Sequence, residues 1–95
     1  MFLMIFLSDG WRISKRTNCY TGVGATSIQP NPWEANKGLD SCKYACFKHP
    51  DCEAIIWGKE TCHLRKDLQK KQCRPNPTVD LLEKPKGKKS VKKAL

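Results

Sequence analysis

The chain has 95 residues, 39% of them hydrophobic, and a formal net charge of +9 at pH 7. This length fits one domain with flanking segments and excludes a large apolar interior as the main source of stability. Residues 1–74 carry 12 basic and 7 acidic side chains, whereas residues 75–95 carry 6 lysines against two acidic residues. This excess is compatible with a polyanionic partner, such as a sulfated glycan, an acidic membrane surface or nucleic acid, and the alternative is a solvated face with a solubilising linker.

The N-terminal segment, residues 1–16, opens with seven apolar residues and ends in the basic side chains Arg12, Lys15 and Arg16. Seven is the lower limit for the hydrophobic region of a signal peptide, and no basic residue precedes it. A membrane-spanning helix needs roughly 20 apolar residues. We therefore predict a weak or truncated secretory leader, with a buried strand as the alternative, and no transmembrane segment anywhere in the chain.

The middle segment, residues 17–75, contains every cysteine and is predicted to be the folded domain. Residues 17–28 form a first strand region, interrupted at Gly22 and Gly24, and prolines then mark a loop. A helix follows, which Asp40 or Ser41 caps through a side-chain oxygen. It ends before Pro50, because the residue preceding a proline avoids the helical conformation. Its apolar face is Leu39, Cys42, Ala45 and Cys46.

A β-hairpin is predicted after the helix. Residues 52–57 and 61–65 are rich in β-branched and aromatic side chains, and residues 58–60 form a three-residue turn that contains glycine. This turn places Cys62 opposite Ile56, so that Cys52, Ile56 and Cys62 share the face that meets the helix. Trp57 then faces away from the helix.

The C-terminal segment, residues 76–95, is rich in lysine and nearly devoid of apolar side chains over residues 84–93. Such a segment repels itself and cannot bury enough surface to fold. We predict a basic disordered tail or linker.

The cysteines are even in number and concentrated in a short stretch, which is typical of a disulfide framework in an oxidising compartment. They are Cys19, Cys42, Cys46, Cys52, Cys62 and Cys73. The alternative is a reduced intracellular module that holds zinc, but only one close cysteine pair has the spacing of a zinc site. No metal and no cofactor is expected. No nucleophile motif is present either, and a bridged cysteine has no thiolate, so the chain is not expected to be an enzyme.

The helix and hairpin together predict the pairing. Cys42 and Cys46 lie one turn apart on the same helix face. The turn at Pro50 returns the chain along the helix, which brings Cys46 beside Cys52 and Cys42 beside Cys62. Cys19 and Cys73 remain and would join the two ends of the domain.

These features resemble the PAN/Apple domain family. The similarity lies in the Cys-x3-Cys-x5-Cys spacing from Cys42 to Cys52, the apolar strand after it, and the sequence of residues 61–65. Cys19 and Cys73 match the extra terminal bridge of Apple-type members, and the resemblance covers roughly residues 17–75. It implies a small disulfide-rich α+β fold, with an antiparallel sheet packed against one central helix and nested bridges.

The resemblance also implies a non-catalytic module that binds proteins or carbohydrates, secreted or at the cell surface within a larger protein. It supplies no binding motif that can be carried over residue by residue. Candidate ligand-binding residues therefore come from charge and aromatic character alone: Trp57, Arg65, Lys66, Lys70, Lys71 and Arg74. The alternative function is polyanion binding by the lysine-rich tail, with the domain as a scaffold. No base-reading motif is present, so specific nucleic-acid recognition is not expected.

Overall fold

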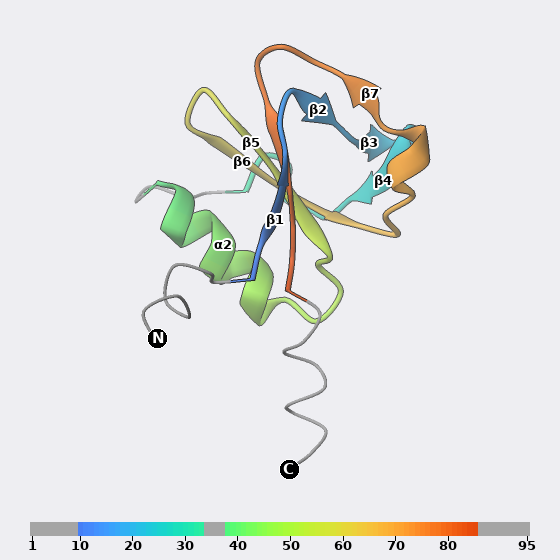
Figure 1. The fold of residues 1–95 in the computed structure, drawn as a ribbon. Helices are drawn as coiled ribbons and strands as arrows, with labels where there is room; N and C mark the ends of the chain where they lie inside the picture. Colours follow the sequence, from blue (N-terminus) through green and yellow to red (C-terminus); the bar gives the residue numbers. More distant parts are fainter. Residues whose placement is uncertain (1–9, 34–37, 86–95) are drawn as a thin grey trace, which may run out of the picture.

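The structure is a computed structural model that describes residues 10–33 and 38–85. Within these residues the protein is a small α+β fold in three layers, with one α-helix, a six-stranded sheet and a short two-stranded ribbon. The helix lies on one side of the sheet and the ribbon on the other (Figure 1). The strands are β1 (Arg12–Ser14), β2 (Thr17–Asn18), β3 (Tyr20–Thr21), β4 (Gly24–Ser27), β5 (Ala54–Gly58), β6 (Thr61–Lys66), β7 (Arg74–Pro75) and β8 (Asp80–Glu83). The helices are α2 (Leu39–Lys48) and the single 3₁₀ turn η1 (Lys70–Gln72).

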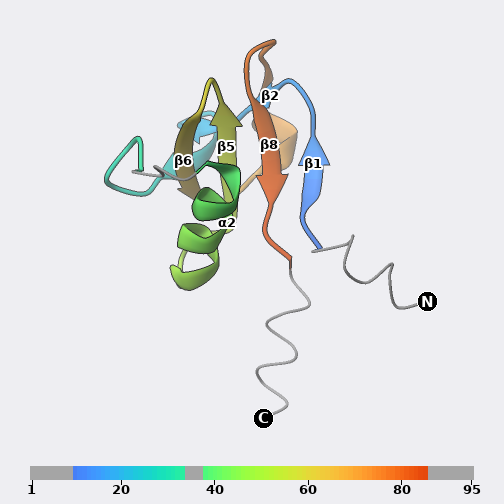
Figure 2. The same cartoon turned by 90° about the vertical axis from the view of Figure 1, so that its left-hand side faces the viewer.

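The main sheet has the strand order β1-β8-β5-β6-β4-β3. Its pairs are antiparallel, as predicted, except that β3 and β4 are parallel. β2 and β7 form the separate ribbon, which the sequence did not predict. Figure 2 shows α2 lying across β5 and β6, with β8 and β1 extending the sheet beyond it.

The two ends of the predicted domain were placed wrongly. The predicted leader, residues 1–16, includes β1, and the predicted tail, residues 76–95, includes β8, which lies between β1 and β5 in the sheet. Leu81 and Leu82 of β8 are both buried, one on each face of the sheet. A strand that is covered on both faces is apolar at consecutive positions, so this short run fits β8. The folded unit therefore extends past residues 17 and 75. The rest of the two segments, residues 1–9 and 86–95, lies outside the described residues.

The helix ends where it was predicted to end. His49 is extended, and its N–H bonds to the carbonyls of Ala45 and Cys46. Its start differs, because Gly38 occupies the cap position with a φ of +89° and no side chain caps the helix. Asp40 lies in the first turn instead, where its charge suits the helix dipole.

The hairpin of β5 and β6 forms, but its register is shifted by one residue from the prediction. The turn has two residues, Lys59 and Glu60, both with positive φ, as in the tight turns that match strand twist. Trp57 is therefore paired with Cys62, and Ile56 with His63. Gly58 is the last residue of β5 and not the first of the turn. Glycine is needed at this position because a side chain there would overlap the backbone of Thr78 and Val79.

Each face of the sheet covers a hydrophobic cluster. The cluster under α2 is built from Ile28, Cys42, Cys46, Cys52, Ile55, Cys62, Leu64 and Leu82. The cluster under the ribbon is built from Cys19, Ala25, Ala54, Ile56 and Leu81. Alternate residues of β5 thus face opposite layers, so the strand is buried on both sides.

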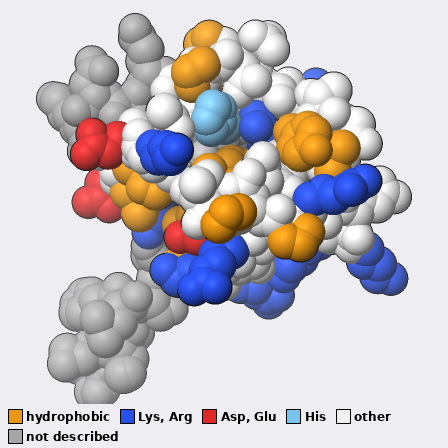
Figure 3. Space-filling view, turned by 90° about the horizontal axis from the view of Figure 1, so that it is seen from above, with side chains coloured by type: hydrophobic (Ala, Val, Ile, Leu, Met, Phe, Trp, Pro, Cys, Tyr) orange, Lys and Arg blue, Asp and Glu red, His pale blue; other side chains and the backbone are white. Residues whose placement is uncertain are grey.

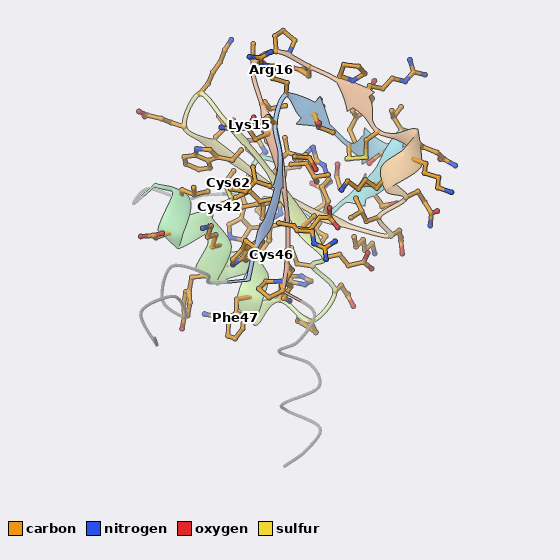
Figure 4. The ribbon with its side chains drawn as sticks, viewed as in Figure 1. Lys15, Arg16, Cys42, Cys46, Phe47 and Cys62 are labelled. Carbon is orange, nitrogen blue, oxygen red and sulfur yellow. A yellow bond between two sulfur atoms is a disulfide. The ribbon has the colours of Figure 1, made fainter. Side chains whose placement is uncertain are left out.

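All six cysteines are bonded in the nested pattern that the sequence predicted. Cys42–Cys62 and Cys46–Cys52 join α2 to the hairpin and to the loop before it, whereas Cys19 and Cys73 tie the ribbon together. Figure 4 labels three of these cysteines, with Cys42 and Cys62 side by side. The pairing is right although the predicted register is wrong, because Cys62 faces the helix in both registers.

Candidate functional site

The structure separates the six side chains that the sequence proposed as a binding group. Trp57, Arg65 and Lys66 belong to the hairpin, whereas Lys70, Lys71 and Arg74 follow it in η1 and β7.

Trp57 was predicted to face away from the helix, and this is wrong. Its partner across the hairpin is Cys62, which is bonded to Cys42 of α2. Directly paired residues share a face, so the indole lies on the helix side, half-buried against the cluster there. Its role is packing, and it is removed from the candidate binding residues.

Arg65 was predicted to belong to an exposed basic patch, but it is only 4% exposed. Its Nε donates to the carbonyl oxygen of Cys19 at 2.6 Å. Burial lowers the pKa of this guanidinium to about 10. The alternation of a strand turns the side chain inward, away from its exposed lysine neighbours in sequence. Arg65 is therefore an interior residue.

The three lysines among the six differ from one another. Lys66 is half-buried and, as the neighbour of Arg65 on β6, points to the opposite face. Lys70 forms an ion pair with Glu83, with Nζ 3.0 Å from Oε2. Lys71 is exposed, and no described residue forms an ion pair with it. Among these three lysines, Lys71 alone is both exposed and without an ion pair to a described residue.

Three exposed basic side chains lie in or beside the β2–β7 ribbon. Asn18 pairs with Arg74, and the backbone N–H of Asn76 donates to the carbonyl of Arg16 at 2.8 Å. The two arginines thus lie within two residues of each other along one ribbon, and Lys71 lies in η1 just before it. We call Arg16, Lys71 and Arg74 the basic ribbon face.

The three side chains of the basic ribbon face form no ion pair with a described residue. By contrast, Lys15 beside them lies 3.6 Å from Asp80. Figure 4 shows Lys15 and Arg16 at the end of the molecule that carries the ribbon, away from Phe47. Seen from above, basic side chains spread across this end, whereas the acidic ones stay to one side (Figure 3).

Arg16 was missed as a binding residue because residues 1–16 were interpreted as a leader. A signal was nevertheless present in the sequence. The predicted Cys19–Cys73 bridge already requires the residues just before Cys19 to approach those around Cys73, which include Lys71 and Arg74. Basic residues that flank two bridged cysteines should therefore be considered together.

His63 is half-buried. Its Nδ1 lies 2.8 Å from Oδ1 of Asn31, which also accepts from Arg65 at 3.2 Å. Burial, and then the charge of Arg65, lower the pKa of His63. No pattern in the sequence indicates that residues 31 and 63 meet.

A zinc site and a cysteine nucleophile would both need free cysteine thiols. The six sulfur atoms that a zinc site or a cysteine nucleophile would use are bonded to one another. Within residues 10–33 and 38–85, no three His, Cys, Asp or Glu side chains gather as metal ligands. In the same residues no helix is long and apolar enough to cross a membrane.

Comparison with known proteins returned no match: no family model, no curated protein and no solved structure is similar to this chain.

Proposed function

We propose that this chain is a non-catalytic extracellular module that binds an acidic carbohydrate, with a sulfated glycan as the ligand class, through its basic ribbon face. The observation that carries the proposal is the Cys19–Cys73 bridge beside the β2–β7 ribbon, because three exposed cations lie in or next to this ribbon and none of them forms an ion pair with a described residue. Because the bridge and the ribbon hold the backbone in place, binding a polyanion requires only the side chains to become ordered. The expected binding is electrostatic and weakens as salt rises.

The extracellular setting and the family are parts of the same proposal. Three disulfides persist in oxidising compartments and are rare in the reducing cytosol. The resemblance to PAN/Apple domains draws support from the nested bridges and from a helix packed on antiparallel strands. That resemblance favours recognition of a partner without chemistry.

The proposal is tested by retention on a heparin column. The variant R16Q/K71Q/R74Q removes the three charges of the basic ribbon face. The control R12Q/K48Q/K59Q removes three exposed charges from β1, α2 and the hairpin turn. We expect the first variant to elute at a much lower salt concentration than the wild type, and the control to elute only slightly earlier. Equal losses in the two variants would mean that net charge alone, and not this face, holds the glycan.

The alternative, in which the lysine-rich tail does the binding, needs a separate truncation. Deleting residues 76–95 would remove β8 and unfold the sheet, so the chain is cut after residue 85 instead. If the basic ribbon face is the site, the truncated chain keeps most of its retention. Retention that collapses on truncation and survives in R16Q/K71Q/R74Q would assign the binding to the tail.

A further inference from the structure

Arg65 carries a buried positive charge, and no acidic side chain in the described part of the chain forms an ion pair with it. It lies in the middle of β6, paired with Ala54 of β5 on one side and with Ser27 of β4 on the other. None of the acidic residues that the structure describes forms an ion pair with it. Burying an unpaired charge is costly, and buried arginines are normally paired. The fold therefore holds at this position a cation that lacks a counter-charge.

The hydrogen bonds of Arg65 leave one end of its guanidinium unused. Nε donates to the carbonyl of Cys19, and Nη1 donates to Oδ1 of Asn31 at 3.2 Å and to the carbonyl of Leu64 at 3.3 Å. All three acceptors are uncharged oxygens. Nη2 has no hydrogen-bond acceptor within residues 10–33 and 38–85. Its two N–H groups are the donors that remain for an acceptor from outside the chain.

His63 lies on the same face of β6, two residues before Arg65. Because Arg65 donates to Oδ1 of Asn31, that atom is an acceptor, and the imidazole Nδ1 must supply the hydrogen in its own 2.8 Å bond. Nε2 then gains a proton only when the ring becomes cationic. One amide oxygen thus holds two potentially cationic side chains side by side.

This cluster reaches solvent. Asn31 is exposed, as are the residues beside it in the loop from Gln29 to Pro32, and His63 is half-buried. An incoming group can therefore approach the cluster from the side of this loop.

We propose that Arg65, His63 and Asn31 form a subsite for a single oxyanion, a carboxylate or a sulfate group. A guanidinium forms strong charge-assisted hydrogen bonds with such groups, and exclusion of water strengthens them. The inference rests on the proposed function for the source of the anion, which is one acidic group of the glycan. The subsite shares no residue with the basic ribbon face, so an experiment can reject either proposal without rejecting the other.

The test is an NMR titration of the full chain with sodium sulfate and, separately, with sodium glucuronate. Sodium chloride keeps the ionic strength constant in both series. A bound oxyanion neutralises Arg65, so we expect saturable shifts in the Arg65 side-chain resonances and a rise in the pKa of His63. A response to sulfate alone or to glucuronate alone supports the subsite and identifies which group it takes. The resonances of His49 provide the internal reference.

Two variants separate a subsite from a general salt effect. R65K keeps a positive charge but loses the forked donor, and H63Q keeps an amide donor to Asn31 without the imidazole. We expect each to weaken anion binding about tenfold, which corresponds to about 1.4 kcal/mol. Anion binding by H63Q is measured from the Arg65 resonances. This variant therefore tests the subsite even if R65K does not fold.

Two results would overturn the subsite. The first is a His63 titration curve that is the same in chloride, sulfate and glucuronate. The second is a shift that grows linearly with anion concentration and affects His49 equally. In either case, loss of heparin retention in R16Q/K71Q/R74Q would still uphold the proposed function, and normal retention in that variant would reject it independently.

Discussion

At the scale of single residues, the exposed amide of Asn31 joins the half-buried His63 to the buried Arg65. Its oxygen accepts from Arg65 and from His63, and Arg65 in turn fixes the carbonyl of Cys19. A loop, a central strand and the start of the ribbon are thus connected through one buried guanidinium. Residues that belong to separate segments of the sequence act here as one network.

The network predicts how stability depends on pH. Because the pKa of His63 is lowered in the folded state, the unfolded chain takes up the proton first as pH falls. His63 therefore makes its full contribution to the free energy of unfolding above about pH 6.5, the pKa of histidine in the unfolded chain. This contribution decreases as the pH falls from that value through the lower pKa of the folded state. Urea denaturation from pH 7.5 to 4.5 measures the decline.

H63Q is the control for this prediction, since it cannot titrate but keeps a donor for Asn31. Carboxylates also titrate near the lower end of the range, so the quantity to follow is the difference between the wild type and H63Q. That difference should change in favour of the variant as pH falls. A difference that stays constant across the range would contradict the prediction.

At the scale of elements, glycine positions decide how closely the layers approach. Gly24, which begins β4 with a φ of +88°, lies against the bridge at Cys73. A Cβ there would lie 2.6 Å from the Cys73 sulfur and 2.9 Å from its backbone nitrogen. Gly22 has a similar φ of +85°, but nothing lies within 4 Å of its missing Cβ.

These two glycines make a matched pair of alanine substitutions. Both G22A and G24A impose the backbone strain of a left-handed residue, roughly 1–2 kcal/mol. G24A also forces the bridge and β4 apart, which should add about 1–3 kcal/mol. Guanidinium denaturation should therefore show G24A as the less stable variant by that margin. Equal midpoints for the two would indicate that β4 and Cys73 are not in close contact.

The hairpin shows why sequence patterns placed its strands but not its register. Glycine is common in turns, so the predicted turn includes Gly58 and covers residues 58–60. The observed turn contains only Lys59 and Glu60. In the structure a neighbouring segment, Thr78 and Val79, requires glycine there for close approach. Lys59 and Glu60 then take positive φ values that their residue types disfavour. A contact distant in the sequence therefore overrides the local turn preference.

At the scale of the whole molecule, the three disulfides stabilise the fold by different amounts. They close loops with sequence separations of 54, 20 and 6 residues for Cys19–Cys73, Cys42–Cys62 and Cys46–Cys52. Loop-closure entropy gives about 4, 3 and 2 kcal/mol respectively. A small domain has only about 5–15 kcal/mol of net stability, so these crosslinks supply much of it.

Removing the bridges one at a time should reproduce this order. We expect C19A/C73A to lose the most stability and C46A/C52A the least, as measured by chemical denaturation of the oxidised proteins. Complete reduction should unfold the chain, with loss of both near-UV and far-UV circular dichroism. Spectra unchanged by reductant, or an inverted order of the pairs, would contradict this account.

The sequence by itself determined the helix end at His49, the hairpin strands, the bridge pattern and the excess of positive charge. These follow from local rules: proline geometry, alternation along strands, and cysteines brought together by short connections. Only the tertiary structure decided that β1 and β8 join the sheet and that Arg65 points inward. It also decided that Arg16 joins Arg74, whereas Trp57 packs under the helix. Each of these depends on which distant segment covers a face, and a strand of three or four residues carries too little pattern to reveal its neighbour.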